Sequence, residues 1–264
     1  MIYTQNNPTS YKRIAHSFSK YANGYDAWAS VQKTFNEKLL DWAKLHIKAL
    51  PSPLMDWGCG TGDLSEKLIR DFKTEAVTLS DISAEMVEVA RSKISKITQN
   101  AEFKVCDAMA YDEWDNFRTV CSGLALQWVT EPYLLLKKIH QTRKPGDVIL
   151  MSWFNEDCFP EWKNACIRNG IPFTGHSMPN PDFFHALALE EDALSFDLRH
   201  ESFKIPVTYP TVRGFFKSMK NIGAGLGNGN QMSFSEYRKL ESELQNEQGC
   251  QITWVADFVL ITYS

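Results

Sequence analysis

A short segment rich in glycine and acidic residues carries the clearest chemical signal in the sequence. Over residues 54–62 it reads Leu-Met-Asp-Trp-Gly-Cys-Gly-Thr-Gly, with three glycines that follow an apolar run. Glycine is needed where a backbone turns tightly against a ligand, because a Cβ atom would collide there. The GxGxG spacing differs from the GxGxxG of dinucleotide-binding loops, and no Lys follows it as a P-loop requires. Asp56 and Asp63 place negative charge on both sides of the loop, so the segment favours a cationic ligand over a pyrophosphate.

Two further acidic residues follow the next two predicted strands. Asp81 ends the second strand and Asp107 ends the third. In an open α/β sheet, ligands bind at the carboxyl ends of the strands, where a carboxylate can accept hydrogen bonds from the hydroxyls of a ribose. Asp107 is placed to accept a hydrogen bond from an adenine edge. Each acid has a structural alternative, since Asp81 could begin a helix and Asp107 could close a turn. Together with the glycine loop, they predict a nucleoside ligand.

Strands and helices alternate through the first part of the chain. We expect strands at 54–57, 76–79, 103–106, 119–121 and 148–154, with helices at 62–72, 83–97 and 133–141. Residues 11–50 are predicted to be helical, and Phe35, Leu39, Trp42 and Ile47 are spaced for one apolar face. This alternation predicts a parallel sheet with helices on both faces.

The alternation stops after residue 154. Residues 155–200 are rich in aromatic residues and prolines without another βα unit, so we expect a cap inserted there. Strands at 202–209 and 252–262, helices at 211–221 and 233–244, and a Gly/Asn-rich loop at 223–230 follow. The predicted fold class is α/β, a doubly wound, mostly parallel seven-stranded sheet. Its parts are an N-terminal helical arm (1–50), a ligand-binding core (51–154), the cap (155–200) and a C-terminal part that completes the sheet (201–264).

The overall composition excludes several classes of protein. The chain has 264 residues, of which 44% are hydrophobic and 23% charged, as in ordinary globular proteins. Its 28 basic and 32 acidic residues give a net charge of −4, which argues against a nucleic-acid binder. No apolar run is long enough to span a bilayer, and residues 1–10 contain no apolar signal segment. We therefore expect a cytoplasmic protein without a membrane partner, and we expect a monomer.

Cysteine and histidine show no spacing typical of a metal site. The six cysteines contain no CxxC pair, and the six histidines form no ligand-like motif. We expect reduced cysteines that pack as small apolar side chains, and no bound metal.

The glycine loop and the acids that follow it resemble those of class I methyltransferases, which use S-adenosylmethionine. The resemblance implies a Rossmann-like core. It implies that the methionine part of the cofactor lies among Asp56, Gly58, Gly60 and Gly62. It further implies that Asp81 binds the ribose, that Asp107 with Ala108 binds the adenine, and that Met86 packs near the adenine. The remaining cofactor contacts that it implies are Ile82 and Ser122.

Four further segments, in the same order along the chain, are similar to malonyl-[acyl-carrier protein] O-methyltransferases of biotin synthesis. They are the arm (18–22, 25–26 and 31–32), Ser-Gly-Leu-Ala-Leu-Gln-Trp at 122–128, Ser-Met-Lys-Asn-Ile-Gly-Ala at 218–224, and the last strand at 253–262. The resemblance implies methyl transfer to the free carboxylate of a malonyl group on acyl carrier protein, an early step of biotin (pimeloyl) synthesis. The sequence departs from this pattern at one position, because Asn is expected after Ser122 and Gly123 stands there. The chain therefore lacks a side-chain amide that would lie near the sulfonium.

Methylation of a carboxylate depends on positioning rather than on a general base. A carboxylate with a pKa of about 4 is already ionised at pH 7. The site has to remove its water and direct one oxygen at the methyl group. Tyr25, Gln127 and Trp128 are the candidate catalytic residues, because an amide and an indole N–H can each donate to a carboxylate and the arm is unusually aromatic. The alternative for Gln127 and Trp128 is packing at a buried strand end, and for Tyr25 a helix contact.

A malonyl group on a carrier also needs positive charge. The arginines near the relevant segments are Arg13, Arg118, Arg143 and Arg213, and the position of Arg213 beside 218–224 favours it slightly. Acyl carrier proteins are acidic, so docking needs a basic surface. The candidates are the arm, with seven basic and three acidic residues, the stretch 137–144, and Arg213, Lys217 and Lys220 on one helical face. Solvated lysines are the alternative for each stretch.

Three other functions fit parts of the pattern. A small-molecule carboxyl methyltransferase similar to trans-aconitate methyltransferases shares the glycine loop and the Ala-Leu-Gln-Trp stretch. A non-catalytic nucleoside-binding module is possible on the same fold, since fold does not fix function. A nicotinamide dehydrogenase is disfavoured by the glycine spacing.

Overall fold

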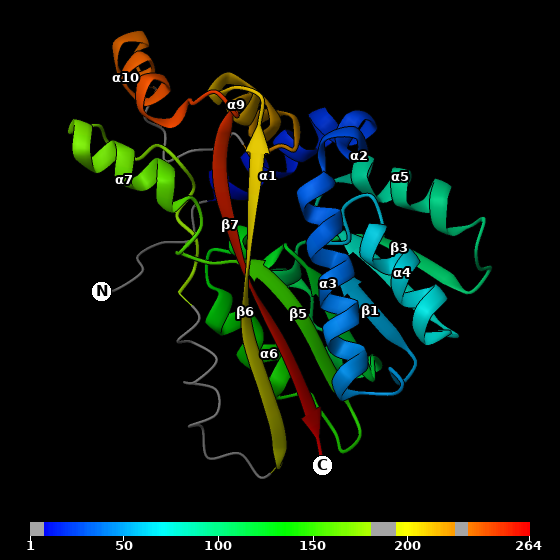
Figure 1. Cartoon of the computed structure of the whole chain (residues 1–264). Helices are drawn as coiled ribbons and strands as arrows, with labels where there is room; N and C mark the ends of the chain where they lie inside the picture. Colours follow the sequence, from blue (N-terminus) through cyan, green and yellow to red (C-terminus); the bar gives the residue numbers. More distant parts are fainter. Residues whose placement is uncertain (1–7, 181–193, 225–231) are drawn as a thin grey trace.

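The computed structural model of the chain describes residues 8–180, 194–224 and 232–264. Within them, a seven-stranded sheet in the order β3-β2-β1-β4-β5-β7-β6 forms the centre of the molecule (Figure 1). Its strands are β1 (Leu54–Trp57), β2 (Val77–Asp81), β3 (Ala101–Val105), β4 (Thr119–Gly123), β5 (Val148–Phe154), β6 (Phe196–Tyr209) and β7 (Cys250–Tyr263). Strands β1 to β5 pair in parallel, and β7 is antiparallel to β5 and β6. The predicted doubly wound, mostly parallel α/β fold is confirmed.

Helices flank the sheet, and the arm is divided into three of them. The helical region predicted at 11–50 contains α1 (Pro8–Tyr21), α2 (Tyr25–Trp28) and α3 (Ser30–His46). The other α-helices are α4 (Asp63–Phe72), α5 (Ala84–Ile94), α6 (Pro132–His140), α7 (Pro160–Asn169), α9 (Val212–Asn221) and α10 (Phe234–Leu244). Ser83 caps α5, with its hydroxyl accepting from the backbone N–H of Met86.

Adjacent residues on the central strands face opposite layers. Leu54 belongs to the core cluster shared with α3, α4 and α5, whereas Met55 belongs to the cluster shared with α6. This follows from the strand geometry, in which successive side chains point to opposite faces. All the residues of β1 are buried, as is typical of a parallel strand covered on both sides.

The C-terminal part differs from the expectation at its first strand. β6 begins at Phe196, inside the range predicted for the cap, because it pairs with β7 from Phe196 opposite Tyr263 to Tyr209 opposite Cys250. Residues along β6 are either partly buried or exposed, and none is fully buried, so its first residues give a weak apolar signal. Residues 181–193 of the predicted cap, and most of the loop predicted at 223–230, lie outside the described residues.

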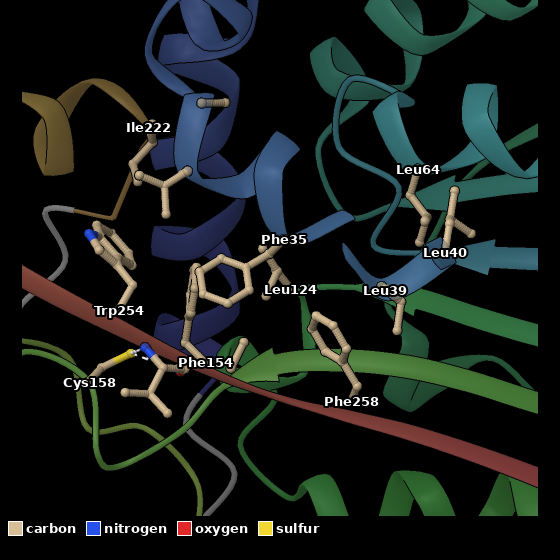
Figure 2. Packing of buried hydrophobic residues seen from close by; sticks show 14 of the residues in the cluster. Phe35, Leu39, Leu40, Leu64, Leu124, Phe154, Cys158, Ile222, Trp254 and Phe258 are labelled. Carbon is tan, nitrogen blue, oxygen red and sulfur yellow. Dashed lines mark hydrogen bonds between the residues drawn. The ribbon is translucent and has the colours of Figure 1, made fainter. Parts of the chain in front are cut away.

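Apolar side chains of α3, with Phe35 at their centre, pack the arm against the sheet. Phe35 is fully buried, and its ring meets those of Phe154 and Phe258 edge-on, with centroids 5.4 and 6.3 Å apart (Figure 2). Leu39 and Trp42, predicted on the same face, are also buried. α3 therefore shares the core of β5 and β7, so the arm is part of the folded domain.

Phe35→Ala is expected to lower the free energy of unfolding by about 3–5 kcal/mol, because it removes a buried ring and leaves a cavity. Leu45→Ala, on the same helix but 79% exposed, is the matched control and is expected to change stability by less than about 0.5 kcal/mol. Urea unfolding of both variants measures the difference. Equal effects would contradict the anchoring role of Phe35.

Candidate active site

The loop between β1 and α4 borders a pocket at the carboxyl ends of the parallel strands, here called the central pocket. Its walls come from the arm, the glycine loop, the ends of β2 and β3, and the segment after β4. The predicted site residues that line it are Tyr25, Gly58, Gly60, Asp81, Ile82, Met86, Asp107, Ala108, Gln127 and Trp128. The structure thus brings together most of the residues that the sequence predicted to share a site.

Two glycines of the loop have different physical roles. Gly58 has a φ of +65°, and a Cβ placed there would lie 2.3 Å from the Cβ of Ala125, so any side chain would push the segment after β4 away. Gly60 has a φ of +53° and no neighbouring atom within 4 Å of such a Cβ. Its backbone is therefore open to a ligand, and a side chain would occupy that space.

Asp81 links the glycine loop to the start of α5. Its carboxylate accepts hydrogen bonds from the backbone N–H of Gly60 at 2.9 Å and of Ser83 at 2.8 Å. Burial raises its pKa, while the N–H donors oppose this effect. The Asp107 carboxylate accepts one such hydrogen bond, from the backbone N–H of Met109 at 3.0 Å. Each carboxylate retains acceptor capacity toward the central pocket.

Three predicted cofactor contacts lie behind the loop instead of lining the pocket. Asp56 is fully buried and accepts from the hydroxyl of Ser65, while its Oδ1 has no partner. Burial, more than any other cause, raises its pKa to about 7. The hydroxyl of Ser122 is buried without a partner, and Gly62 faces Ala90 of α5. These positions support the loop, which differs from the direct contact that was predicted.

Asp26 of α2 fastens the arm onto the glycine loop. Its carboxylate accepts from the hydroxyl of Thr61 at 2.7 Å and pairs with Lys93 of α5, and Lys33 donates to its backbone carbonyl at 3.0 Å. Burial alone would raise the pKa of Asp26, but the hydrogen bonds from Lys93 and Thr61, with the nearby lysine charges, lower it. Asp26 is therefore ionised and holds three elements together.

The neighbouring Tyr25 presents a phenol to the central pocket. Burial raises its pKa, and the charges of Asp81, Asp26 and Asp63 raise it further. The phenol therefore stays protonated at neutral pH, and it can act as a hydrogen-bond donor but not as a base.

Trp128 is held between two rings that come from distant parts of the chain. His176 stacks on it with centroids 4.5 Å apart, and Phe18 of α1 meets it edge-on at 5.3 Å. His176 also donates to the backbone oxygen of Gln127 at 2.6 Å, and burial lowers the pKa of its imidazole. These contacts fix the plane of the indole at the pocket wall.

The Gln127 amide is engaged by the backbone on both of its ends. Its Nε2 donates to the carbonyl of Leu124 at 2.6 Å, and its Oε1 accepts from the N–H of Phe154 at 3.3 Å. Gln127 thus braces the segment that carries Trp128. Its Nε2 has a second N–H, so its role as a donor to the substrate stays a prediction.

Two carboxamides on α3 were not predicted as site residues. Gln32 and Asn36 are one helical turn apart, line the central pocket and are 8% and 7% exposed. Neither Gln32 Oε1 nor Asn36 Oδ1 has a hydrogen-bond partner among the described residues. A pair of amides inside an otherwise apolar helix face is the signal by which the sequence could have identified them.

Asn36 explains why glycine stands at position 123. A Cβ on Gly123 would lie 2.7 Å from Asn36 Oδ1 and 2.9 Å from Leu64 Cδ2. Asn36 Nδ2 meanwhile donates to Asp63 at 2.9 Å. The amide expected after Ser122 therefore does not fit, and α3 places another amide in the same space.

The arginines predicted as partners for a substrate carboxylate lie elsewhere. Arg143 is buried and donates to the carbonyls of Ile139, Phe117 and Trp114. The remaining three are Arg118, which pairs with Asp147, and Arg13 and Arg213, which are exposed. The cationic side chain among the described residues that line the central pocket is Lys33, which contacts Asp26.

Other chemistries have little support in the part of the chain that the structure describes. All six cysteines are free thiols, and five of them are buried. Within the described ranges, no group of three or more His, Cys, Asp or Glu residues is arranged to hold a metal ion. No described helix combines the length and apolarity needed to cross a membrane.

Comparison with known proteins gives one match to a domain family and several relatives whose similarity covers most of the chain. Residues 54–146 match the model of a methyltransferase domain. The chain is 29% identical to the malonyl-[acyl-carrier protein] O-methyltransferase of Priestia megaterium, a match that covers 90% of this chain and 92% of the relative. The enzyme of the same name from Acetivibrio thermocellus is 28% identical, with 89% and 84% covered.

Comparison with solved structures supports the fold. The YcgJ protein of Bacillus subtilis aligns with a TM-score of 0.57 at 17% identity, covering 86% of this chain and 97% of its own. The N-methyltransferase NodS of Bradyrhizobium japonicum aligns with a TM-score of 0.54 at 13% identity, with 93% and 97% covered. The Rossmann-like methyltransferase fold implied by the sequence is confirmed.

Asp81→Ala is expected to weaken binding of S-adenosylmethionine by about 10- to 100-fold, because it removes charged hydrogen bonds worth about 1.5–3 kcal/mol each. Calorimetric titration measures the dissociation constant. Asp41→Ala, which removes an exposed carboxylate 78% accessible to solvent, is the control and should leave affinity unchanged. Unchanged affinity in Asp81→Ala would remove this residue from the cofactor site.

Asp56→Asn is expected to remove a pH dependence of stability. The folded-state pKa of about 7 lies above the unfolded value of about 3.9, so the folded state binds more protons between them. The stability that this carboxyl contributes is present below about pH 4 and is lost as the pH rises to about 7. Urea unfolding at pH 5 and pH 8 should show a larger decline for the wild type than for Asp56→Asn. Parallel declines would show that Asp56 is ionised throughout.

Proposed function

We propose that this chain is a class I methyltransferase that uses S-adenosylmethionine and that it esterifies the free carboxylate of malonyl-acyl carrier protein. The observation that carries the proposal is the extent of its similarity to enzymes of that name. The methyltransferase-domain match ends at residue 146, whereas the similarity to the Priestia enzyme covers 90% of the chain. The similarity therefore extends well beyond the matched methyltransferase domain, into the arm and the C-terminal part.

The residues of the central pocket fit a cationic methyl donor. Its wall holds the buried carboxylate of Asp81, the partly exposed Asp107 and the unpartnered carbonyl oxygen of Asn36. Gly60 leaves room for a ligand against the backbone, as the methionine part requires. Asp81 would hold the ribose and Asp107 the adenine. When bound, S-adenosylmethionine supplies an electrophilic methyl group on a positively charged sulfur.

Neutral donors suit the acceptor carboxylate better than an arginine. The protonated phenol of Tyr25 and the indole N–H of Trp128 can each donate one hydrogen bond, which orients the carboxylate. The positive charge of Lys33 is offset by Asp26. A carboxylate held by neutral groups keeps its negative charge on the attacking oxygen. Methyl transfer then removes one negative and one positive charge, so it is favoured in a pocket from which water is excluded.

The surface of α9 fits an acidic carrier protein. Arg213, Lys217 and Lys220 are all exposed, and none has an ion pair with an acid among the described residues. Complementary charge of this kind speeds encounter with an acidic partner. Esterification would hide a carboxylate that elongation enzymes would otherwise have to bury at a cost. The product could then be extended towards a pimeloyl chain for biotin synthesis.

Incubation with methyl-labelled S-adenosylmethionine tests the proposal. Malonyl-acyl carrier protein should become labelled and the label should be lost on mild alkaline hydrolysis, as expected of an ester. Free trans-aconitate, offered at the same concentration, should remain unlabelled. The opposite result would identify a small-molecule carboxyl methyltransferase.

Trp128→Phe is expected to lower kcat by about 10- to 100-fold with little change in cofactor affinity, because it removes one donor to the carboxylate. Trp42→Phe is the control, since its indole donates to Glu201 at 2.8 Å and does not line the central pocket. Steady-state kinetics and calorimetry separate the two effects. A loss of cofactor affinity with unchanged kcat would make Trp128 a packing residue.

A further inference from the structure

A second hollow lies beside the central pocket, between α2 and α9, and is here called the side groove. Its walls include Ala27, Trp28 and Ser30 on one side, and Gly214, Lys217 and Ser218 of α9 on the other. Figure 1 shows α2 and α9 at the same end of the molecule. The groove therefore opens on the surface that also carries the basic residues of α9.

The side groove and the central pocket share a partition of three residues. Gln32, Ile222 and Trp254 line both hollows and are 8%, 5% and 2% exposed. Ile222 and Trp254 belong to the core cluster drawn in Figure 2. These three residues thus separate a surface groove from the pocket in which methyl transfer is proposed to occur. A narrow chain could pass if they moved apart.

The groove has positive charge at its rim and aromatic surface inside. Lys217 lies over the ring of Trp28, 5.3 Å from its centroid, and both side chains are exposed. Tyr209, Pro210 and Trp254 also line the groove. Such a surface suits a slender ligand with an anionic group at its outer end and little charge along its length.

Gln32 adds a specific requirement at the partition. Its Oε1 is buried without a donor, which is costly unless a ligand provides one. The oxygen can only accept, so it selects a ligand group that carries an N–H or O–H.

We propose that the side groove receives the phosphopantetheine arm of the carrier protein, an inference that rests on the proposed function. The arm begins with a phosphate, continues through two amides and ends in the thioester that carries the malonyl group. Lys217 pairs with the phosphate, an amide N–H donates to Gln32 Oε1, and the malonyl end passes the partition into the central pocket. Arg213 and Lys220 meet the acidic carrier surface beside the groove.

Ala27→Trp tests the route by filling the groove from an exposed position on α2. With malonyl-acyl carrier protein, kcat/KM is expected to fall at least 10-fold. With malonyl-N-acetylcysteamine, which lacks the phosphate and most of the arm, the fall should be less than 3-fold. Asn23→Trp, an equally bulky change at an exposed residue that lines neither hollow, is the control and should match the wild type on both substrates.

The outcomes separate the route from the proposed function. Unchanged kcat/KM of Ala27→Trp with the carrier substrate would overturn the route, and so would an equal loss on both substrates. If the wild type does not methylate malonyl-acyl carrier protein at all, the proposed function itself has failed.

Gln32→Leu gives a second test that does not depend on blocking the groove. It is expected to raise KM for malonyl-acyl carrier protein about 10-fold and to leave the dissociation constant of S-adenosylmethionine unchanged. Thermal unfolding should not fall, because the variant buries no unpaired oxygen. Weaker cofactor binding with an unchanged KM would overturn the proposal by assigning Gln32 to the methyl donor.

Discussion

The site depends on one interaction, the attachment of the arm to the glycine loop through the carboxylate of Asp26. This side chain binds Thr61 in the loop and Lys93 on α5, and it stays ionised because those donors outweigh the effect of burial. Without it, the parallel sheet would still present glycines and acids at its edge. The attachment places Tyr25 over that edge and turns an open crevice into a pocket.

Negative charge and unpartnered acceptors then define what the pocket can hold. The carboxylate of Asp81 is buried beside Tyr25, and Asn36 adds a carbonyl oxygen that has no donor among the described residues. A cation that carries several N–H and O–H groups would offset the negative charge of the carboxylate and donate a hydrogen bond to the unpartnered oxygen. Burial, with the charges of Asp81, Asp26 and Asp63, keeps the phenol of Tyr25 protonated, so this group can donate a hydrogen bond instead of adding charge. Methyl donor and carboxylate would be accommodated by one electrostatic arrangement.

Elements that surround the core complete the walls of the central pocket. The arm, the segment with His176 and α9 each contribute to the walls around Trp128 and Trp254. These elements are held by aromatic contacts, such as that of Phe35 with Phe154, which are insensitive to the identity of the substrate. Under the proposed function, these surroundings would select the carboxylate and its carrier, while the core binds the cofactor.

The sequence by itself determined the alternation of strands and helices, the glycine loop, and the acids Asp81 and Asp107, because these are local patterns set by the ends of neighbouring parallel strands. It could not decide which residues would face the ligand. Asp56 and Ser122 proved to lie behind the loop, Arg143 binds backbone carbonyls, and Asn36 fills the space that Gly123 leaves open. Each of these outcomes rests on contacts between segments far apart in the chain, where the tertiary packing of α3 and the segment after β4 fixes distances that no local spacing encodes.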